Sequence, residues 1–286
     1  MKPSPEPGPL TAAQLEDFID RTLAEDVGAG DVTAEATIPA DARFRARIAA
    51  RERIVVAGLP VALAIVRRLA PDAAVHVAVG DGGVAEPGDA VVRIDGPARA
   101  LLTAERSALN ILQHLSGIAT LTRRYVDAVA GTGAKVLDTR KTIPGLRLLE
   151  KYAVKMGGGT NHRMGLWDAV LIKDNHIAVA GGVTAAIRAC QGHTGLKVQV
   201  ECDTLEQARE AVAAGADSLL LDNMSLAELR EAVGFAGGRV PLEASGGVRL
   251  DTIRGIAETG VDFISVGRLT QSAPAVDFGM DFESVD

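Results

Sequence analysis

The chain has 286 residues, enough for one large domain or two smaller ones, and 47% of them are hydrophobic, which excludes a disordered chain. A net charge of −7 and an aromatic content of 3% argue against a protein that binds nucleic acid. No apolar run approaches the ~18 residues that a membrane span needs, and the N-terminal residues lack the apolar core of a signal peptide. We therefore expect a cytoplasmic protein that binds neither nucleic acid nor membrane.

A first helix is predicted directly after the Pro-rich residues 1–10, because Thr11 and Gln14 match a capping box and an apolar face follows. The next part of the chain, residues 43–100, contains short alternating or β-rich runs separated by Gly-containing turns. A second helix begins within it at Pro60. Together these elements predict an antiparallel sheet accompanied by helices.

A third helix is predicted over residues 103–116, with Gly117 just past its end. From there the pattern becomes a β–α repeat. The predicted strands are residues 134–138, 169–173, 197–201, 218–222, 241–245 and 263–267. Helical runs lie between them, two of which begin with capping boxes at Thr204 and Ser225. This alternation predicts a parallel sheet with its helices outside.

The predicted parallel strands end in residues that can react or bind anions. These residues are Asp138, Lys173, Glu201, Asp222, Ser245 and Gly267. In a barrel all six strand ends converge on one mouth, whereas in an open doubly wound sheet they spread along an edge. A barrel would bring these strand-end residues into one site, whereas an open sheet would separate them, so we favour a barrel. Because only about six strands are evident, fewer than the eight of a full barrel, the barrel is expected to be incomplete.

Positive charge is concentrated in one segment of this acidic protein. Residues 135–173 contain eight Lys and Arg residues against three acidic ones, which suggests a local anion site. Arg140 and Lys141 directly follow the first predicted barrel strand, and His162 and Arg163 follow a run of three glycines. Arginine offers a planar fork and lysine a point charge for a carboxylate or phosphate, although an exposed Arg-Lys pair is more often a solvated surface.

Three more strand-end residues are candidates for chemistry. Lys173 can serve as an anion ligand, as a Schiff-base nucleophile, or as a structural partner of nearby carboxylates. Glu201 and Asp222 can bind ribose hydroxyls, hold Mg²⁺ through water, stabilise developing positive charge, or balance the lysines. Neither cysteine, Cys190 nor Cys202, has disulfide or metal-site spacing around it, so both are expected to be core thiols in a reducing compartment.

Two glycine-bearing loops follow the last two predicted strands. They are EASGGVR at residues 243–249 and SVGRLT at residues 265–270. Backbone N–H groups in such loops cradle phosphate, and barrels often place a phosphate site there. The sequence therefore predicts a mouth with a phosphate at one side, ribose and metal in the middle, and other anions on the basic side.

Several motifs, in order and suitably spaced, resemble the quinolinate phosphoribosyltransferase family. They are TAERSALNILQHLSGIAT, DTRKTIPGLR, KYAVKMGGGTNHRMGL, LIKDNH, LLLDN, ASGGV and VGRLT. The resemblance extends over nearly the whole chain, from about Leu15 to Phe282. It implies an α/β protein with an N-terminal α/β sandwich domain and an incomplete parallel α/β barrel. In this sequence the sandwich corresponds to residues 1–116, the barrel to residues 117–272, and a C-terminal segment that returns to the first domain to residues 273–286.

The resemblance also implies an activity. Such an enzyme, a glycosyltransferase of pyridine nucleotide and NAD biosynthesis, joins quinolinate to phosphoribosyl pyrophosphate with Mg²⁺. The products are nicotinate mononucleotide, pyrophosphate and CO₂. The family's basic unit is a homodimer, which implies that Arg106 reaches the active site of the neighbouring subunit.

The site residues that the resemblance implies fall into groups. Quinolinate would be surrounded by Arg106, Arg140, His162, Arg163 and Lys173, and Thr139 also belongs to the substrate-binding residues. Lys141 would reach the pyrophosphate, and Glu201 and Asp222 would hold ribose and the metal, the latter through water or substrate. The catalytic group would be Lys141, Lys173, Glu201 and Asp222. The 5′-phosphate would lie against Ser245, Gly246, Gly247, Val266, Gly267 and Arg268, the last a departure from the small residue more usual in the family.

Three other functions are compatible with these residues. One is that of a paralogue of the same family associated with molybdenum uptake. Another is a lyase that forms a Schiff base through Lys173, and the last is a barrel that binds anions without catalysis.

Overall fold

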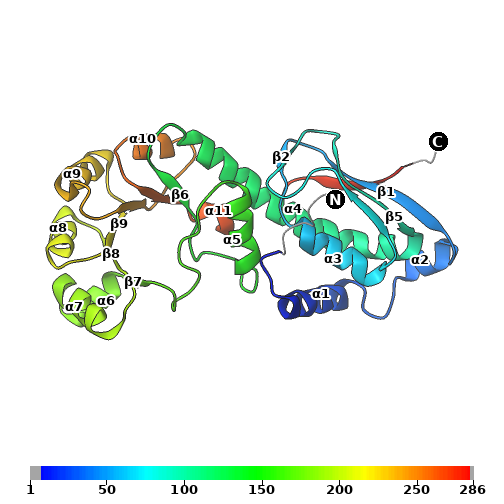
Figure 1. The fold of residues 1–286 in the computed structure, drawn as a ribbon, viewed down its shortest axis with the longest axis horizontal. Helices are drawn as coiled ribbons and strands as arrows, with labels where there is room; N and C mark the ends of the chain where they lie inside the picture. The colour runs from blue at the N-terminus through cyan, green and yellow to red at the C-terminus, as the bar shows by residue number, and fades with distance from the viewer. Residues whose placement is uncertain (1–7, 284–286) are drawn as a thin grey trace. The chain divides into compact units, whose positions relative to one another are not determined.

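A computed structural model of the chain describes residues 8–283 and separates into two compact units. The first unit consists of Met1–Leu121, Leu148–Gly158 and Ala273–Asp286, and the second of Thr122–Arg147 and Gly159–Ser272. The predicted fold class is confirmed: an antiparallel sheet with helices lies in the first unit and a parallel sheet with helices in the second (Figure 1).

The first unit is built on a four-stranded antiparallel sheet. Its elements are α1 (Ala12–Asp26), α2 (Val32–Thr37), β1 (Arg43–Ala50), β2 (Ile54–Val55), α3 (Leu59–Leu69), β3 (Ala74–Val77), β4 (Val84–Ala85), β5 (Ala90–Pro97), most of α4 (Ala98–Ala128), α5 (Arg147–Met156) and β12 (Phe278–Phe282). The strand order is β12-β1-β5-β3, and β2 pairs with β4 in a separate ribbon. Helix α3 and the first turns of α4 lie along one face of the sheet (Figure 1). The predicted Thr11–Gln14 capping box is present at the start of α1.

The last described strand completes the edge of this sheet. β12 runs antiparallel to β1, with Phe282 opposite Ala46 and Phe278 opposite Ala50. Arg51, just past β1, binds Asp281 of β12 at 2.5 Å. The C-terminal segment therefore belongs to the first unit through backbone pairing as well as side-chain contacts.

Helix α4 is much longer than predicted. It runs from Ala98 to Ala128 and passes through Gly117, which was expected to lie beyond the end of a helix over residues 103–116. A Cβ on Gly117 would stand 2.2 Å from the backbone oxygen of Pro274. Glycine is required at this position because another segment of backbone packs against the helix there, and not because the helix ends.

Helix α5 interrupts the range 117–272 expected for the barrel, because Leu148–Gly158 groups with the first unit. Two hydrogen bonds show why. His114 Nε2 on α4 lies 2.9 Å from the buried Glu150 Oε1, and the hydroxyl of Tyr152 donates to Asp81 at 2.7 Å. Both contacts tie α5 to side chains of the first unit.

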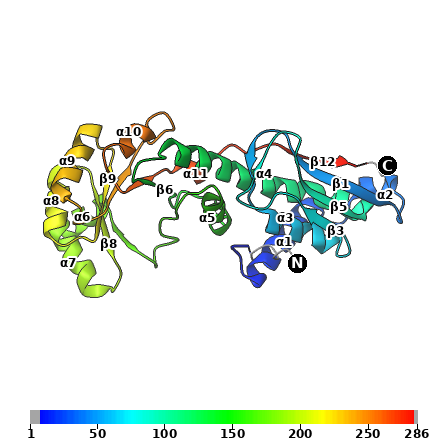
Figure 2. The same cartoon turned by 45° about the horizontal axis from the view of Figure 1, so that its top comes forward.

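The second unit is a six-stranded parallel sheet with helices outside it. After the end of α4, its elements are β6 (Lys135–Leu137), β7 (Val170–Ile172), α6 (Asp174–Ala180), α7 (Val183–His193), β8 (Val198–Cys202), α8 (Leu205–Ala213), β9 (Ser218–Asp222), α9 (Leu226–Ala236), β10 (Leu242–Ser245), α10 (Ile253–Ala257), β11 (Phe263–Ser265) and α11 (Arg268–Gln271). The strand order is β6-β11-β10-β9-β8-β7, so β6 and β7 form the edges of an incomplete barrel. Helices α7, α8 and α9 line one side of this sheet (Figure 2).

Side chains alternate between the two faces of these strands, as the pleat of a strand requires. On β8, Val198, Val200 and Cys202 are buried, while Gln199 and Glu201 stand on the opposite face. The apolar face provides the core beneath the helices, and the other face carries the polar side chains of the site. No helix within residues 8–283 is both long enough and apolar enough to cross a membrane.

Candidate active site

A cavity of about 900 Å³ lies within the second unit, at the carboxyl ends of its parallel strands. It is lined by Thr139, Arg140, Lys141, His162, Arg163, Leu171, Lys173, Glu201, Leu220, Asp222, Asn223, Glu243, Ser245, Gly246, Gly247, Val248, Arg249, Ser265, Gly267, Arg268 and Gln271. The volume is at the upper end of the range for small-molecule sites. The predicted convergence of strand ends on one mouth is thus present in the structure.

One wall of the cavity is strongly basic. Burial lowers the pKa of Arg163, and the positive charge of the nearby Arg140 lowers it further. The negative charge of Asp168 acts in the opposite direction. The Nε of Arg140 is buried and has no hydrogen-bond partner among the described residues. These two neighbouring guanidinium groups suit an anionic ligand. Such a ligand would offset the repulsion between their charges and accept a hydrogen bond from the unpaired Arg140 Nε–H.

Arg147 holds together the two loops that carry these arginines. Its guanidinium donates to Thr142 Oγ1 at 3.0 Å, to the Arg140 carbonyl at 3.4 Å and to the Met164 carbonyl at 3.2 Å. Arg163 in turn donates from Nη1 to the Ala169 carbonyl at 3.1 Å. The basic wall is therefore fixed by hydrogen bonds to main chain, with one planar side chain linking its two halves.

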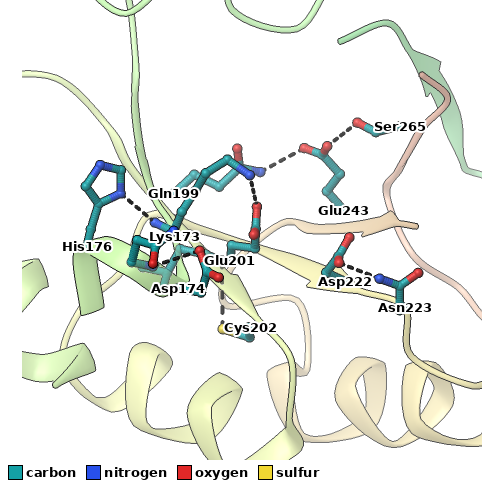
Figure 3. Close-up of polar contacts among 12 residues, drawn as sticks. Lys173, Asp174, His176, Gln199, Glu201, Cys202, Asp222, Asn223, Glu243 and Ser265 are labelled. Atoms are coloured by element: carbon teal, nitrogen blue, oxygen red, sulfur yellow. Dashed lines mark hydrogen bonds and ion pairs between the residues drawn. The ribbon is translucent and has the colours of Figure 1, made fainter. Parts of the chain in front are cut away.

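Lys173 and Glu201 form an ion pair at the ends of the neighbouring strands β7 and β8 (Figure 3). The Lys173 side chain is about half exposed, and that of Glu201 is mostly covered. The ion pair occupies the Lys173 amine with a carboxylate, whereas a Schiff-base nucleophile needs a free amine. The geometry therefore supports an anion-binding ammonium group and disfavours the Schiff-base alternative.

Asp222 stands at the end of β9, next to β8, so its carboxylate and that of Glu201 come from neighbouring strands. Asn223 donates from Nδ2 to Asp222 Oδ2 at 2.6 Å (Figure 3). Asn223 has a φ of +55°, a left-handed conformation that asparagine tolerates better than most residues. This backbone turn places the amide beside the carboxylate and fixes the direction of Asp222.

The two glycine loops stand where the phosphate was predicted. Gly246 and Gly247 have φ values of +93° and +59°, and a Cβ on Gly246 would lie 2.1 Å from Asn223 Oδ1. In the second loop, a Cβ on Gly267 would lie 3.2 Å from the Lys141 side chain. Glycine is required at Gly246 because of its positive φ and the close approach of Asn223. The Lys141 side chain lies against Gly267 of the second loop.

A network of polar side chains forms the floor of the cavity. Glu243 on β10 is 2% exposed, yet its carboxylate accepts hydrogen bonds from Ser265 and, at 2.8 Å, from Gln199 (Figure 3). His162 Nε2 lies 3.3 Å from the same carboxylate. Burial acts to raise the pKa of Glu243, but the bonds from His162, Ser265 and Gln199 outweigh it and hold the pKa below its ordinary value.

Two predicted site residues do not line the cavity. Val266 is buried, and its backbone N–H donates to the Leu137 carbonyl at 2.9 Å, so that amide is used within the sheet. Arg106 is exposed on α4 in the part of the chain that belongs to the first unit. The remaining predicted residues are brought together around one cavity.

Several lining or supporting residues were missed from the sequence, chief among them Gln199, Glu243, Asn223, Arg147 and Arg249. A signal for two of them exists: Gln199 precedes Glu201 by two positions, and Glu243 precedes Ser245 by two, so each pair shares a strand face. Cys202 points to the other face, and burial raises the pKa of its thiol to about 12, which excludes it as a nucleophile here.

The chain is similar to known proteins over almost its full length. Family models for the C-terminal and N-terminal domains of quinolinate phosphoribosyl transferase match residues 118–281 and 31–116. A relative from Mycobacterium leprae (strain TN), described as nicotinate-nucleotide pyrophosphorylase (carboxylating), is 44% identical over 272 residues, which cover 93% of this chain and 96% of the relative. A probable enzyme of the same description from Bacillus subtilis (strain 168) is 40% identical, covering 94% and 93%.

Solved structures show the same likeness. The nicotinate-nucleotide pyrophosphorylase from Francisella tularensis superposes with a TM-score of 0.92 and 39% identity, covering 96% of this chain and 98% of that one. The resemblance predicted from the motifs is confirmed. The chain belongs to the quinolinate phosphoribosyl transferase family.

Proposed function

We propose that this protein transfers the phosphoribosyl group of phosphoribosyl pyrophosphate to quinolinate, with loss of CO₂, to form nicotinate mononucleotide and pyrophosphate in NAD biosynthesis. The observation that carries this proposal is a single cavity in which the basic wall, the carboxylates Glu201 and Asp222, and two glycine loops face one another. Family membership and the names of the relatives point to the same reaction.

The basic wall suits the two adjacent carboxylates of quinolinate. Arg140 and Arg163 supply two positive charges within the cavity, and Lys173 adds a third that Glu201 pairs. Thr139 and His162 also line the cavity. A single carboxylate would leave part of this charge uncompensated in a partly desolvated site, which costs several kcal/mol. We therefore expect discrimination against nicotinate, which lacks the second carboxylate, by roughly 10⁴.

The other side of the cavity suits phosphoribosyl pyrophosphate. The backbone of Ser245, Gly246, Gly247 and Gly267 would hold the 5′-phosphate, with Arg268 and Arg249 at the same rim. Glu201 and Asp222 would bind the ribose hydroxyls, and Lys141, which lies over the Gly267 loop, would meet the pyrophosphate. Each part of this substrate thus has a chemically matching partner.

The donor set fits Mg²⁺ held mainly by substrate. Within residues 8–283, no three His, Cys, Asp or Glu side chains gather into a metal site. Glu201 and Asp222 on adjacent strands offer the one or two carboxylates with which Mg²⁺ binds alongside substrate phosphates and water. When bound, the ion supplies positive charge that neutralises the departing pyrophosphate.

The residues of this chain contribute positioning and charge. The basic wall would hold quinolinate so that its ring nitrogen faces the ribose carbon. As the bond from that carbon to pyrophosphate breaks, Glu201 and Asp222 stabilise the cationic carbon, and the ring nitrogen forms the new bond. The ring then carries positive charge, so it accepts the electron pair left at the adjacent carbon when CO₂ departs, and that carbon takes up a proton. No covalent intermediate with the protein is needed.

We also propose a homodimer in which Arg106 completes the quinolinate site of the neighbouring subunit. Its exposure on α4 and its place in the first unit support this role. A cytoplasmic location is supported by the two free cysteines, which suit a reducing compartment.

The direct test is a product assay with quinolinate, phosphoribosyl pyrophosphate and Mg²⁺ that follows CO₂ release and nucleotide formation separately, with nicotinate as competitor. We expect equal amounts of both products from quinolinate and almost none from nicotinate. Comparable kcat/KM for nicotinate, or nucleotide formed without CO₂, would overturn the proposal.

Removing either strand-end carboxylate should slow the reaction. We expect Glu201→Ala and Asp222→Ala to lower kcat by about 10²–10³, because each loses a charge aimed at the cationic ribose carbon. Glu206→Ala, an acidic residue in the first turn of α8 outside the cavity, is the control and should retain wild-type kcat. Wild-type kcat in both site variants would show that the carboxylates have been assigned wrongly.

A further inference from the structure

The buried floor of the cavity faces the imidazole of His162. Glu243 is a carboxylate and can only accept hydrogen bonds, so the side chain of Gln199, 2.8 Å away, must present its NH₂ group to it. The amide oxygen of Gln199 then faces His162 Nε2 at 3.1 Å. The Gln199 oxygen and the Glu243 carboxylate, which face this ring nitrogen, are therefore both acceptors.

The other ring nitrogen has a donor as its neighbour. The backbone N–H of Arg163 points to His162 Nδ1 at 2.7 Å, so Nδ1 must carry a lone pair. The two sides of the ring agree: the proton is on Nε2 and Nδ1 is an acceptor. The backbone N–H of His162 itself donates to the fully buried Asp138 at 2.8 Å, which fixes the main chain of this residue.

From these contacts we infer that Glu243 is a positioning residue, which holds His162 in the Nε2–H form so that Nδ1 fixes the backbone of Arg163 in the quinolinate site. The inference rests on the proposed function for the identity of the substrate. It assigns His162 a role within the wall: both ring nitrogens are used inside the protein, and the group offered to a substrate carboxylate is the Arg163 guanidinium.

The reverse tautomer would break this arrangement. A proton on Nδ1 would face the Arg163 N–H across 2.7 Å, with a donor on each side, and the loop carrying Arg163 would have to move. The Arg163 guanidinium is also held by its hydrogen bond to the Ala169 carbonyl. A shift of the Arg163 backbone should therefore turn the guanidinium within the cavity without removing it from the cavity. Loss of the floor should therefore weaken quinolinate binding selectively.

The first test is spectroscopic and uses the unaltered protein. The chain has five histidines, so ¹⁵N–¹H correlation spectra of the imidazoles contain five sets of signals, and the set missing from His162→Gln belongs to His162. We expect the His162 proton to be on Nε2 and Nδ1 to be unprotonated, with and without quinolinate. A proton on Nδ1, or an imidazolium in the quinolinate complex, would overturn the inference.

The second test compares two substitutions of Glu243. Glu243→Gln keeps one acceptor for Gln199 and His162 and can turn its NH₂ toward the Ser265 hydroxyl, so tautomer and kinetics should stay near those of the wild type. Glu243→Leu removes both acceptors while keeping most of the volume. It should mix the tautomers of His162 and raise KM for quinolinate by about 10-fold, with KM for phosphoribosyl pyrophosphate changed by no more than about twofold.

A matched control is available in the first unit, where the buried Glu150 contacts His114 at 2.9 Å. Glu150→Leu should leave KM for quinolinate unchanged. The inference would be wrong if Glu243→Leu raised KM equally for quinolinate and for phosphoribosyl pyrophosphate. It would also be wrong if Glu150→Leu raised KM for quinolinate as much as Glu243→Leu does. Absence of turnover by the wild type would contradict the proposed reaction, whereas the tautomer measurement requires no turnover.

Discussion

Arg147 shows how much a site depends on a residue that does not line it. Its three donors link the Thr142 hydroxyl and the carbonyls of Arg140 and Met164, which lie on separate loops. A lysine could keep the positive charge but could not reach three acceptors in one plane. The fork of the guanidinium, and not its charge, is what the two loops require.

We expect Arg147→Lys to raise KM for quinolinate by about 10-fold, since each lost hydrogen bond contributes on the order of 1 kcal/mol to the placement of the basic wall. The measurement is steady-state kinetics with each substrate varied in turn. Arg254→Lys serves as the control, because Arg254 also donates to a distant carbonyl, that of Ala130, but stands on α10 outside the cavity. An unchanged KM for quinolinate in Arg147→Lys would show that the loops hold their positions without this link.

The sequence predicted the strand-end residues that line the cavity, but not Gln199 and Glu243, which lie further inside their strands. Lys173, Glu201 and Asp222 were found because a polar residue directly after an apolar run is conspicuous and the carboxyl ends of parallel strands meet. Gln199 and Glu243 lie inside their strands. The period of two places each on the face of a strand-end residue, but it does not show which side chains they contact. Their partners come from strands distant in the chain, and no local signal records such contacts.

At the scale of elements, the strands of the parallel sheet were predicted closely, and the long helix was not. Each predicted barrel strand overlaps an observed one, from β6 to β11, and the capping boxes at Thr204 and Ser225 start α8 and α9. The predicted end of the helix at residue 116 was wrong, because a glycine at the end of an apolar helical pattern, such as Gly117, is typical of a C-cap. The actual reason for Gly117 is Pro274, a residue more than a hundred positions away, which local sequence cannot indicate.

Two glycines inside helices should respond oppositely to the same substitution. A Cβ added to Gly234 in α9 would have no atom within 4 Å, so Gly234→Ala should stabilise the protein by ~0.4–1 kcal/mol through the lower entropy of the unfolded chain. In Gly117→Ala the new methyl group would meet the Pro274 backbone at 2.2 Å, so we expect a loss of stability of about 1–3 kcal/mol. Thermal or urea unfolding of both variants measures this. A gain in stability from Gly117→Ala would show that the C-terminal segment shifts freely.

At the scale of the whole molecule, the proposed shared site makes a prediction about mixed dimers. If Arg106 serves the neighbouring subunit, a dimer of one Arg106→Ala chain and one Lys173→Ala chain has one site with both lesions and one with neither. Random reassociation of the two inactive variants should then restore about a quarter of wild-type activity. The yield of heterodimer is measured separately, by mass spectrometry of tagged chains.

Two results would speak against a shared site. One is a confirmed heterodimer without activity. The other is an Arg106→Ala variant that retains wild-type KM for quinolinate on its own.

The pairing of β12 with β1 affects how the first sheet folds while the chain is still being synthesised. β1 is made early, but one of its edges is covered only by β12, the last described strand of the chain. During synthesis on the ribosome, that edge presents unpaired backbone N–H and C=O groups while the whole second unit is being translated. The first unit thus cannot complete this sheet before residues 278–282 have been made, although most of the unit emerges first. Nascent chains stalled anywhere before residue 278 should expose this edge of β1 to chaperones or to other nascent copies.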